Sequence, residues 1–315
     1  MKENTAGDSL IPGMSPGGNE TLPADAAAAL ADLDERDIIT RIWRKDHTVW
    51  KPEPAEITNR LGWLNVTDSM PEQAPSLRSF AQEISGAGFR HIVLLGMGGS
   101  SLGAEVLRQV FGSTAGYPEL MVLDSTVPAA VQAVSGTIDP ARTLFLVSSK
   151  SGTTTEPLLF FRYFKGLAES ATGKGKAGQN FAAITDAGTP LAELAKNEGF
   201  HRTFFNPSDI GGRYSVLSYF GLVPAALTGV DIEALFERSG NMRAACASSV
   251  PARDNPGAQL GAYLGASAMK GRDKLTLITS PAISSFGFWV EQLIAESTGK
   301  DGRGIIPITG EPLAE

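Results

Sequence analysis

Short, almost wholly apolar runs alternate with amphipathic segments along most of the chain. HIVLLG (91–96), TLFLVSS (143–149) and FAAITDAG (181–188) are apolar over nearly their whole length, which is typical of strands buried on both faces of a parallel sheet. The segment EPLLFFRYFKGLAES (156–170), between the last two of them, has helical spacing. This alternation predicts a doubly wound α/β fold, with ligand-binding loops at the carboxyl ends of the strands.

The same pattern predicts the other elements of this sheet. Two further strands are expected at 119–125 and 202–207, and helices are expected at 75–87 and 189–198. A long helical stretch then runs, with interruptions, from about 215 to 269. Together these segments predict a first α/β domain over residues 75–225.

A second α/β unit is expected in residues 226–315, after a helical linker. The strands KLTLITSP and GIIPITG flank the helix SFGFWVEQLIAEST, and the chain then stops at Glu315. Two parallel strands do not bury each other, so this domain is expected to be incomplete. The sequence therefore predicts either a truncated chain or a partner that completes the second domain.

The region before the first domain divides into two parts. Residues 1–24 are rich in Gly, Pro, Asn, Ser and Thr without periodicity, which predicts a disordered arm. Residues 25–74 are expected to form a helical lead-in, with one helix over 24–46 and a second, short one over 54–61.

Composition narrows the class of partner. The net charge is −7 and the pI about 5.2, so the surface as a whole repels nucleic acid and anionic membranes, and a phosphorylated ligand needs a local cluster of donors. No apolar run is long enough for a membrane span, and no signal peptide is expected. The single cysteine, Cys246, indicates a reducing, cytoplasmic setting, and three histidines with one cysteine argue against a dedicated zinc site.

A glycine-rich loop, GMGGSS (96–101), follows the first strand. Glycines permit close backbone approach to a ligand, and the N–H groups at the start of the next helix attract anions. The alternatives are an ordinary strand–helix turn and a dinucleotide fingerprint that uses Gly96, Gly98 and Asp124. Ser101 stands at the third glycine position of that fingerprint, so the match is imperfect.

A hydroxyl-rich loop follows the strand at 143–149. Six Ser and Thr residues, a lysine and a glycine lie between Ser148 and Thr155, directly before a helix. A helix cap requires one hydroxyl, whereas this loop has several in Ser149, Ser151, Thr153 and Thr154. With the dipole of the next helix, this loop predicts a phosphate-binding site.

Two later segments contain candidate catalytic residues. SDIGGRYSVLS (208–218) places Arg213 between a strand and a helix, where its guanidinium can bind an oxyanion or hold the loop against a carboxylate. In VEQLIAESTGK (290–300), Gln292 and Glu296 share one helix face, and Glu296 is either a general base or a solvated helix-end residue.

These segments together resemble the glucose-6-phosphate isomerase family. GMGGSSLG, SSKSGTTTEP, DIGGRYSVLS and EQLIAESTGK occur in that family's order and approximate spacing, and the resemblance extends from about residue 40 to the C-terminus. It implies two doubly wound sugar-isomerase domains. The segment RIWRKDHTVWKPEPAEITNRLGWL (41–64) also resembles the lead-in to the isomerase part of transaldolase–isomerase fusions.

The resemblance implies a role for each matching residue in the interconversion of glucose 6-phosphate and fructose 6-phosphate. Glu296 is the base that moves a proton between C2 and C1, Arg213 stabilises the enediolate, and Gln292 contacts the substrate. The family's reaction uses no metal or cofactor, and its full-length members are homodimers. Phosphate-binding and sugar-lining roles are implied for Ser149, Lys150 (through its main-chain N–H), Ser151, Thr154, Gly99 and Ser100.

The chain departs from the family pattern at two residues. The family uses a ring-opening histidine downstream of the glutamate and a lysine near its C-terminus, whereas His47, His91 and His201 all precede Glu296. We therefore expect this chain alone to isomerise poorly or not at all. The alternatives are a non-catalytic sugar-phosphate sensor and a dinucleotide-dependent oxidoreductase.

Overall fold

The computed structural model describes residues 24–312. The disordered arm expected for residues 1–24 lies outside this range, except for Ala24, where the first helix begins. The strands are β1 (His91–Leu95), β2 (Glu119–Leu123), β3 (Thr143–Ser148), β4 (Phe181–Asp186), β5 (Arg202–Asn206), β6 (Lys274–Leu277) and β7 (Ile306–Thr309). The helices are α1 (Ala24–Glu35), α2 (Ile38–Trp43), α3 (Val66–Ser69), α4 (Ala74–Gly86), α5 (Leu102–Phe111), α6 (Pro128–Thr137), α7 (Thr155–Thr172), α8 (Pro190–Asn197), α9 (Tyr219–Leu227), α10 (Ile232–Ala245), α11 (Pro256–Met269) and α12 (Phe286–Thr298).

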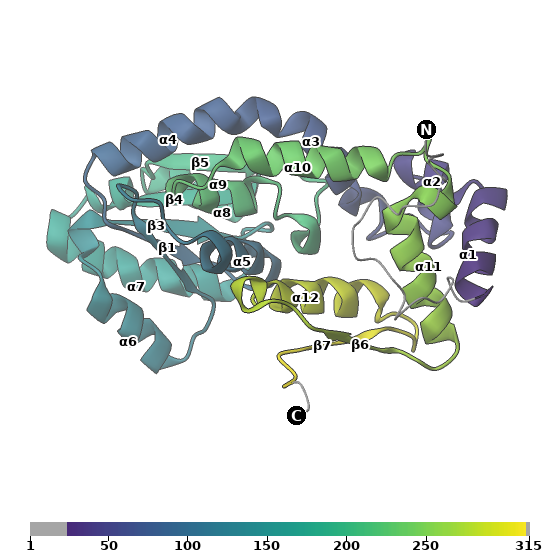
Figure 1. Cartoon of the computed structure of the whole chain (residues 1–315). Coiled ribbons are helices and arrows are strands. Elements are labelled where there is room, and N and C mark those ends of the chain that lie inside the picture. Colours follow the sequence, from purple (N-terminus) through teal and green to yellow (C-terminus); the bar gives the residue numbers. More distant parts are fainter. Residues whose placement is uncertain (1–23, 313–315) are drawn as a thin grey trace, which may run out of the picture.

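A five-stranded parallel sheet forms the centre of the molecule. Its strand order is β2-β1-β3-β4-β5, and helices cover both faces, with α4 on one side and α6 and α7 on the other in Figure 1. The predicted α/β class and doubly wound sheet are confirmed. The strands are apolar throughout because both of their faces are buried.

Alternate side chains of each strand enter two separate apolar layers. Leu144 and Leu146 of β3 pack in the layer formed with α4 and α9, whereas Phe145 and Val147 pack in the layer formed with α7. Phe145 stacks between Phe164 of α7 and Phe181 of β4, with ring centroids 5.0 Å apart in each pair. This packing holds α7, and the loop that precedes it, firmly against the sheet.

The order of the strands determines where a ligand site can form. The chain reverses direction across the sheet between β1 and β3, and in such folds the crevice beyond the carboxyl ends of these two strands receives the ligand. The two strands end level with each other, since Leu95 pairs with Val147. The glycine-rich loop after β1 and the hydroxyl-rich loop after β3 therefore flank this position.

The lead-in differs from the helices expected for it. The helix expected over 24–46 is divided into α1 and α2, because Asp37 adopts a positive φ of 52°. The short helix expected over 54–61 is absent from this part of the structure, where a 3-10 turn, Thr58–Arg60, is formed instead. Glu56 has a positive φ of 59°, which is incompatible with a continuous right-handed helix there.

The C-terminal unit contains the strands and helix expected for it. Strands β6 and β7 form a two-stranded parallel sheet, and α12 packs between this sheet and α5, which flanks the five-stranded sheet (Figure 1). Neither strand has a fully buried residue.

Among the described residues, no helix combines the length and apolar character that a membrane crossing requires.

Candidate active site

The hydroxyl-rich loop after β3 is held in a compact turn by its own side chains. The Ser149 hydroxyl accepts a hydrogen bond from the main-chain N–H of Gly152 at 3.2 Å and donates one to the Thr154 hydroxyl at 3.1 Å. Ser151 and Thr153 are exposed, and their hydroxyl oxygens lie 2.9 Å apart, within hydrogen-bond distance. Gly152 has a φ of 66°, which favours glycine.

The amino end of α7 adds donors to this loop. Thr154 stands at the N-cap, but its side chain makes no capping hydrogen bond. The first N–H groups of a helix have no partner within the helix, and the dipole makes this end attractive to anions. The exposed Ser151 and the N-cap Thr154 thus lie with the first N–H groups of α7, whereas Ser149 is buried and its hydroxyl is used within the turn. The phosphate site expected here stays a prediction.

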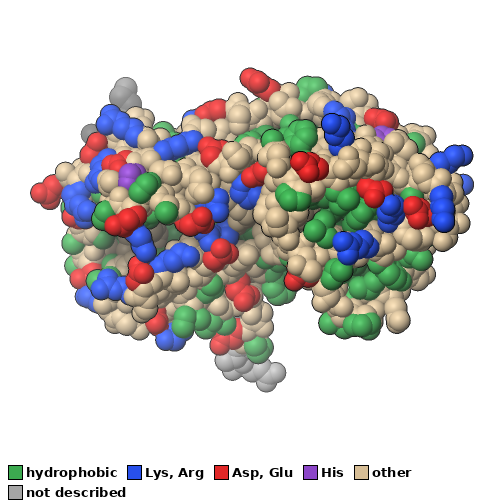
Figure 2. All heavy atoms as spheres, turned by 180° about the vertical axis from the view of Figure 1, so that it is seen from behind, with side chains coloured by type: hydrophobic (Ala, Val, Ile, Leu, Met, Phe, Trp, Pro, Cys, Tyr) green, Lys and Arg blue, Asp and Glu red, His purple; other side chains and the backbone are tan. Residues whose placement is uncertain are grey.

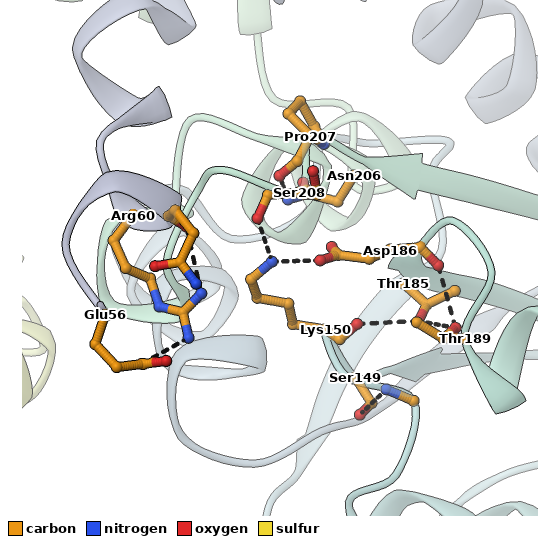
Figure 3. A network of polar contacts seen from close by, with 12 residues as sticks. Glu56, Arg60, Ser149, Lys150, Thr185, Asp186, Thr189, Asn206, Pro207 and Ser208 are labelled. Atoms are coloured by element: carbon orange, nitrogen blue, oxygen red, sulfur yellow. Dashed lines mark hydrogen bonds and ion pairs between the residues drawn. The ribbon is translucent and has the colours of Figure 1, made fainter. Parts of the chain in front are cut away.

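Lys150 extends its side chain away from Ser149 (Figure 3). Its ammonium group forms an ion pair with Asp186, the last residue of β4, and donates to the main-chain carbonyl of Ser208 at 2.8 Å. The lysine charge is thus engaged by the protein. The main-chain N–H of Lys150 is the group expected to face a phosphate, and the side-chain geometry is compatible with that expectation.

The glycine-rich loop packs backbone to backbone against the loop that carries Arg213. A Cβ atom on Gly99 would lie 2.4 Å from the carbonyl carbon of Gly212. The Ser215 hydroxyl contacts both carbonyl oxygens, at 3.1 Å from Gly99 and 2.7 Å from Gly212. The missing side chain of Gly99 therefore allows the backbone of the Arg213 loop to approach closely.

A further hydrogen bond connects the glycine-rich loop to the hydroxyl-rich loop. The Ser148 hydroxyl, fully buried at the end of β3, donates to the Ser100 carbonyl at 2.8 Å. On the other side, a Cβ atom on Gly98 would lie 3.1 Å from Nε2 of Gln292. Gly99 and Ser100 are thus placed between the hydroxyl-rich loop and α12.

Arg213 and Glu296 meet as an ion pair between η8 (Gly212–Tyr214) and the last turns of α12. Gln292, one turn before Glu296, donates from Nε2 to the glutamate at 3.4 Å. Nε of Arg213 and Oε1 of Gln292 are buried, and neither has a hydrogen-bond partner among the described residues. A donor and an acceptor beside the glutamate are thus shielded from solvent and have no hydrogen-bond partner among the described residues.

Aromatic side chains hold the arginine in place. Trp289 donates its indole N–H to the Arg213 carbonyl at 3.1 Å. The Arg213 guanidinium lies over the ring of Tyr214, which stacks on Trp63 with ring centroids 5.3 Å apart. Only 16% of the Arg213 side chain is exposed, compared with 49% for Glu296, so a fixed cation faces a more accessible carboxylate.

The three histidines lie elsewhere. His47 contacts the Pro52 carbonyl, His201 contacts Glu83, and His91 begins β1 at the end opposite the glycine-rich loop. None of them contacts Glu296 or Arg213. The structure therefore assigns no histidine of this chain to the candidate site.

The dinucleotide alternative obtains little support from this geometry. Asp124 follows β2, and burial raises the pKa of its carboxyl group, with a smaller contribution in the same direction from Glu105. Gly98 and Gly99, in turn, face Gln292 and Gly212. The glycines of this loop thus serve contacts within the protein.

Two residues that the sequence analysis did not single out take part in this arrangement. Ser215 joins the glycine-rich loop to the arginine loop, and Asp186 holds Lys150. The position of Asp186, at the carboxyl end of a strand next to β3, was a usable signal, because the ends of neighbouring parallel strands meet at one edge.

Charges of both signs are mixed over the surface shown in Figure 2. Asp and Glu side chains lie among Lys and Arg there, and hydrophobic side chains separate them. No broad positive surface forms on this face. Anion recognition on this face would thus depend on local donors.

Comparison with known proteins shows which family the chain resembles. The family model for phosphoglucose isomerase matches residues 62–304. The glucose-6-phosphate isomerases of Staphylococcus saprophyticus and Symbiobacterium thermophilum are 37% and 36% identical to the chain, and each match covers 78% of this chain and 57% of the relative. The chain thus spans little more than half the length of these curated relatives.

Solved structures show the same fold. The glucose-6-phosphate isomerase of Chlamydia trachomatis aligns with a TM-score of 0.76 at 21% identity, over 90% of this chain and 61% of the other. A hypothetical protein of Thermus thermophilus, TT0462, aligns with a TM-score of 0.74 at 26% identity, over 92% and 68%. Because the family model matches most of the chain, the chain belongs to the phosphoglucose isomerase family.

Proposed function

We propose that this chain binds a sugar phosphate and carries the proton-transfer residues of a glucose-6-phosphate isomerase. The observation that carries the proposal is the pairing of Arg213 with Glu296, next to Gln292 and beside the glycine-rich loop that follows β1. The relatives bear the name glucose-6-phosphate isomerase, which identifies glucose 6-phosphate and fructose 6-phosphate as the substrates to test.

In the proposed reaction, Glu296 removes the proton from C2 of the open-chain aldose. The electron pair of the C–H bond forms the C1–C2 double bond, and negative charge develops on the carbonyl oxygen at C1. Arg213, fixed by Trp289 and Tyr214, stabilises this charge. The oxygen at C1 takes up the proton that the C2 hydroxyl gives up, so that the C2–O bond becomes the carbonyl of the ketose. The electron pair of the C1–C2 double bond takes the proton that Glu296 returns to C1.

The phosphate is proposed to bind at the hydroxyl-rich loop after β3. Ser149, Ser151 and Thr154 supply hydroxyls, Lys150 supplies its main-chain N–H, and α7 contributes its amino end. Gly99 and Ser100, between this loop and α12, line the sugar. A ligand held by its phosphate is thereby directed toward Arg213 and Glu296.

Solvent deuterium exchange tests the proposal. The purified chain is incubated with glucose 6-phosphate in deuterium oxide, and loss of the C2 proton signal is followed by NMR. Exchange by the wild type that disappears in Glu296→Gln, with sugar-phosphate affinity nearly unchanged, is the expected result. Binding without exchange in the wild type would contradict the catalytic proposal and favour the sensor alternative.

The matched control is Glu291→Gln. Glu291 is also an exposed glutamate of α12, but it stands one position from Gln292 and points to a different side of the helix. This variant should exchange the C2 proton at the wild-type rate. A loss equal to that of Glu296→Gln would show that the measurement reports helix charge and not a base.

We also propose dimerisation and ring opening, which the family resemblance implies, and a cytoplasmic location, which the single cysteine indicates. The match covers 57% of the relative, and His47 and His201 contact residues outside the candidate site. Ring opening is therefore expected to limit turnover more strongly than proton exchange. Full isomerase turnover by the 315-residue chain would overturn that expectation.

A further inference from the structure

Lys150 joins the ends of three neighbouring strands. It follows β3, its ammonium group pairs with Asp186 at the end of β4, and the same group donates to the Ser208 carbonyl after β5 (Figure 3). Ser208 begins the segment that leads to Arg213. One side chain therefore connects the hydroxyl-rich loop to the loop that carries the arginine.

The main chain strengthens this connection. The Lys150 carbonyl accepts hydrogen bonds from the Asp186 N–H at 3.2 Å and from the Thr185 hydroxyl at 3.3 Å. Thr185 also contacts Thr189, whose hydroxyl caps α8. The hydroxyl-rich loop is thus joined to the end of β4 by hydrogen bonds and by an ion pair.

The ion pair is well shielded from water. The side chains of Lys150 and Asp186 are 20% and 15% exposed, and Oδ1 of Asp186 is buried without a partner among the described residues. A buried ion pair of this kind is often no more stabilising than apolar residues of the same size. Its presence beside the candidate phosphate site therefore calls for a role other than stability.

We propose that Asp186 is a positioning residue, which through Lys150 holds the phosphate-binding loop in register with the arginine loop. The inference rests on the proposed function, since it concerns the same site. In this proposal the Lys150 ammonium group binds Asp186 and Ser208 within the protein and does not bind the phosphate. Phosphate binding and the position of Arg213 then both depend on the Lys150–Asp186 pair. Neither residue touches the reacting carbons in this account.

The key variant is Asp186→Asn in the full chain, with Lys165→Met as the matched control. Lys165 of α7 also forms an ion pair with a partly exposed carboxylate, Glu198, at 2.5 Å, but its partner lies beyond the other end of α8. Asp186→Asn should weaken the affinity for inorganic phosphate, measured by calorimetry, about tenfold or more, since a small misplacement of binding groups has large effects. Lys165→Met should leave this affinity unchanged.

A readout without ligand distinguishes positioning from general loosening. Amide hydrogen exchange should rise in Asp186→Asn in both segments 149–154 and 208–213, while the rates in β1 and β3 stay as in the wild type. Lys150→Arg keeps a cation that can reach Asp186 and Ser208, and should retain most of the affinity. Lys150→Met, which keeps the length without the charge, should lose it.

The possible outcomes separate this inference from the proposed function. If the wild type binds phosphate but never exchanges the C2 proton, catalysis fails while the comparison of Asp186→Asn with the wild type still tests positioning. Equal phosphate affinity in Asp186→Asn and the wild type, or faster exchange in 149–154 alone, would overturn the inference. Uniformly faster exchange over the whole sheet would overturn it also.

Discussion

Arg213 forms an ion pair with Glu296, although the two residues belong to different units of the fold. Arg213 lies in a loop after the last strand of the five-stranded sheet, and Glu296 lies in the last turns of α12. The contact is possible because Gly99 and Gly212 pack closely and because Trp289 of α12 holds the Arg213 carbonyl. The proposed site is thus a property of the interface between these units.

Replacement of Arg213 by lysine should reduce C2 proton exchange strongly while the fold is retained. Lysine keeps the charge, but it lacks the planar fork that reaches Glu296 while lying over Tyr214. We expect a loss of about 100-fold in rate, the usual effect of removing one charge-stabilising donor. NMR-detected exchange measures it.

Arg108→Lys is the control for this prediction. Arg108 pairs with Glu105 within α5, outside the candidate site. Its replacement should change the exchange rate by less than about twofold, because the partly buried pair lies within α5 and contacts neither Arg213 nor Glu296. A similar loss of exchange in both variants would contradict the prediction that Arg213 has a specific role.

Gly99→Ala should force the glycine-rich loop away from the arginine loop. The new methyl group would lie 2.4 Å from a backbone carbon of Gly212, and a backbone atom cannot move aside as a flexible side chain does. We expect a cost of about 1–3 kcal/mol in the free energy of unfolding, together with loss of C2 exchange. Urea denaturation and NMR provide the two measurements.

Gly166→Ala tests whether the effect is specific to that contact. Gly166 lies within α7, and a Cβ atom there meets nothing within 4 Å. The substitution should raise the free energy of unfolding by about 0.5–1 kcal/mol, because alanine has the higher helix propensity. Destabilisation by this variant as well would point to a general intolerance of substitution.

The stability of the fold should depend on pH through Asp186. Burial raises the pKa of this carboxyl group above its ordinary value of 3.8, against opposing contributions from Lys150 and Arg60. Between the ordinary and the raised pKa, the folded state holds the proton and the unfolded state has lost it. The contribution of Asp186 to stability is therefore full below the ordinary value and is lost as the pH rises through the raised value.

Asp186→Asn removes this titration. Urea denaturation of both proteins between pH 3 and pH 8 should show the variant gaining stability relative to the wild type as the pH rises through this window. Together with the expected loss of phosphate affinity, this result would separate function from stability at one residue. A difference in stability that does not change with pH would contradict the prediction.

The C-terminal unit should promote self-association. Large apolar side chains are exposed on β7, on α12 and in the segments around them, and such side chains favour association where they adjoin one another. These residues are Ile278, Ile283, Phe286, Phe288 and Ile306. Sedimentation velocity should show concentration-dependent dimers or larger species, and Phe288→Ser should shift the distribution toward monomer. A single monomeric species in the wild type at high concentration would refute this.

The sequence by itself determined the class of the fold and the places where ligand loops occur. Strands buried on both faces must be apolar throughout, and glycines and hydroxyls directly after such strands stand at the carboxyl edge of a parallel sheet. For this reason the loops after β1 and β3 were recognisable. The motifs around Arg213 and Glu296 were recognisable by their resemblance to one family.

Only the tertiary structure decided which of these groups meet. The Lys150–Asp186 pair and the approach of Gly99 to Gly212 join residues distant in sequence, and no local pattern specifies such contacts. The sequence pattern also did not predict the backbone geometry of the lead-in, because Asp37 and Glu56 adopt positive φ values that composition does not reveal. Local periodicity reports which side of an element is buried, whereas long-range packing selects its neighbours.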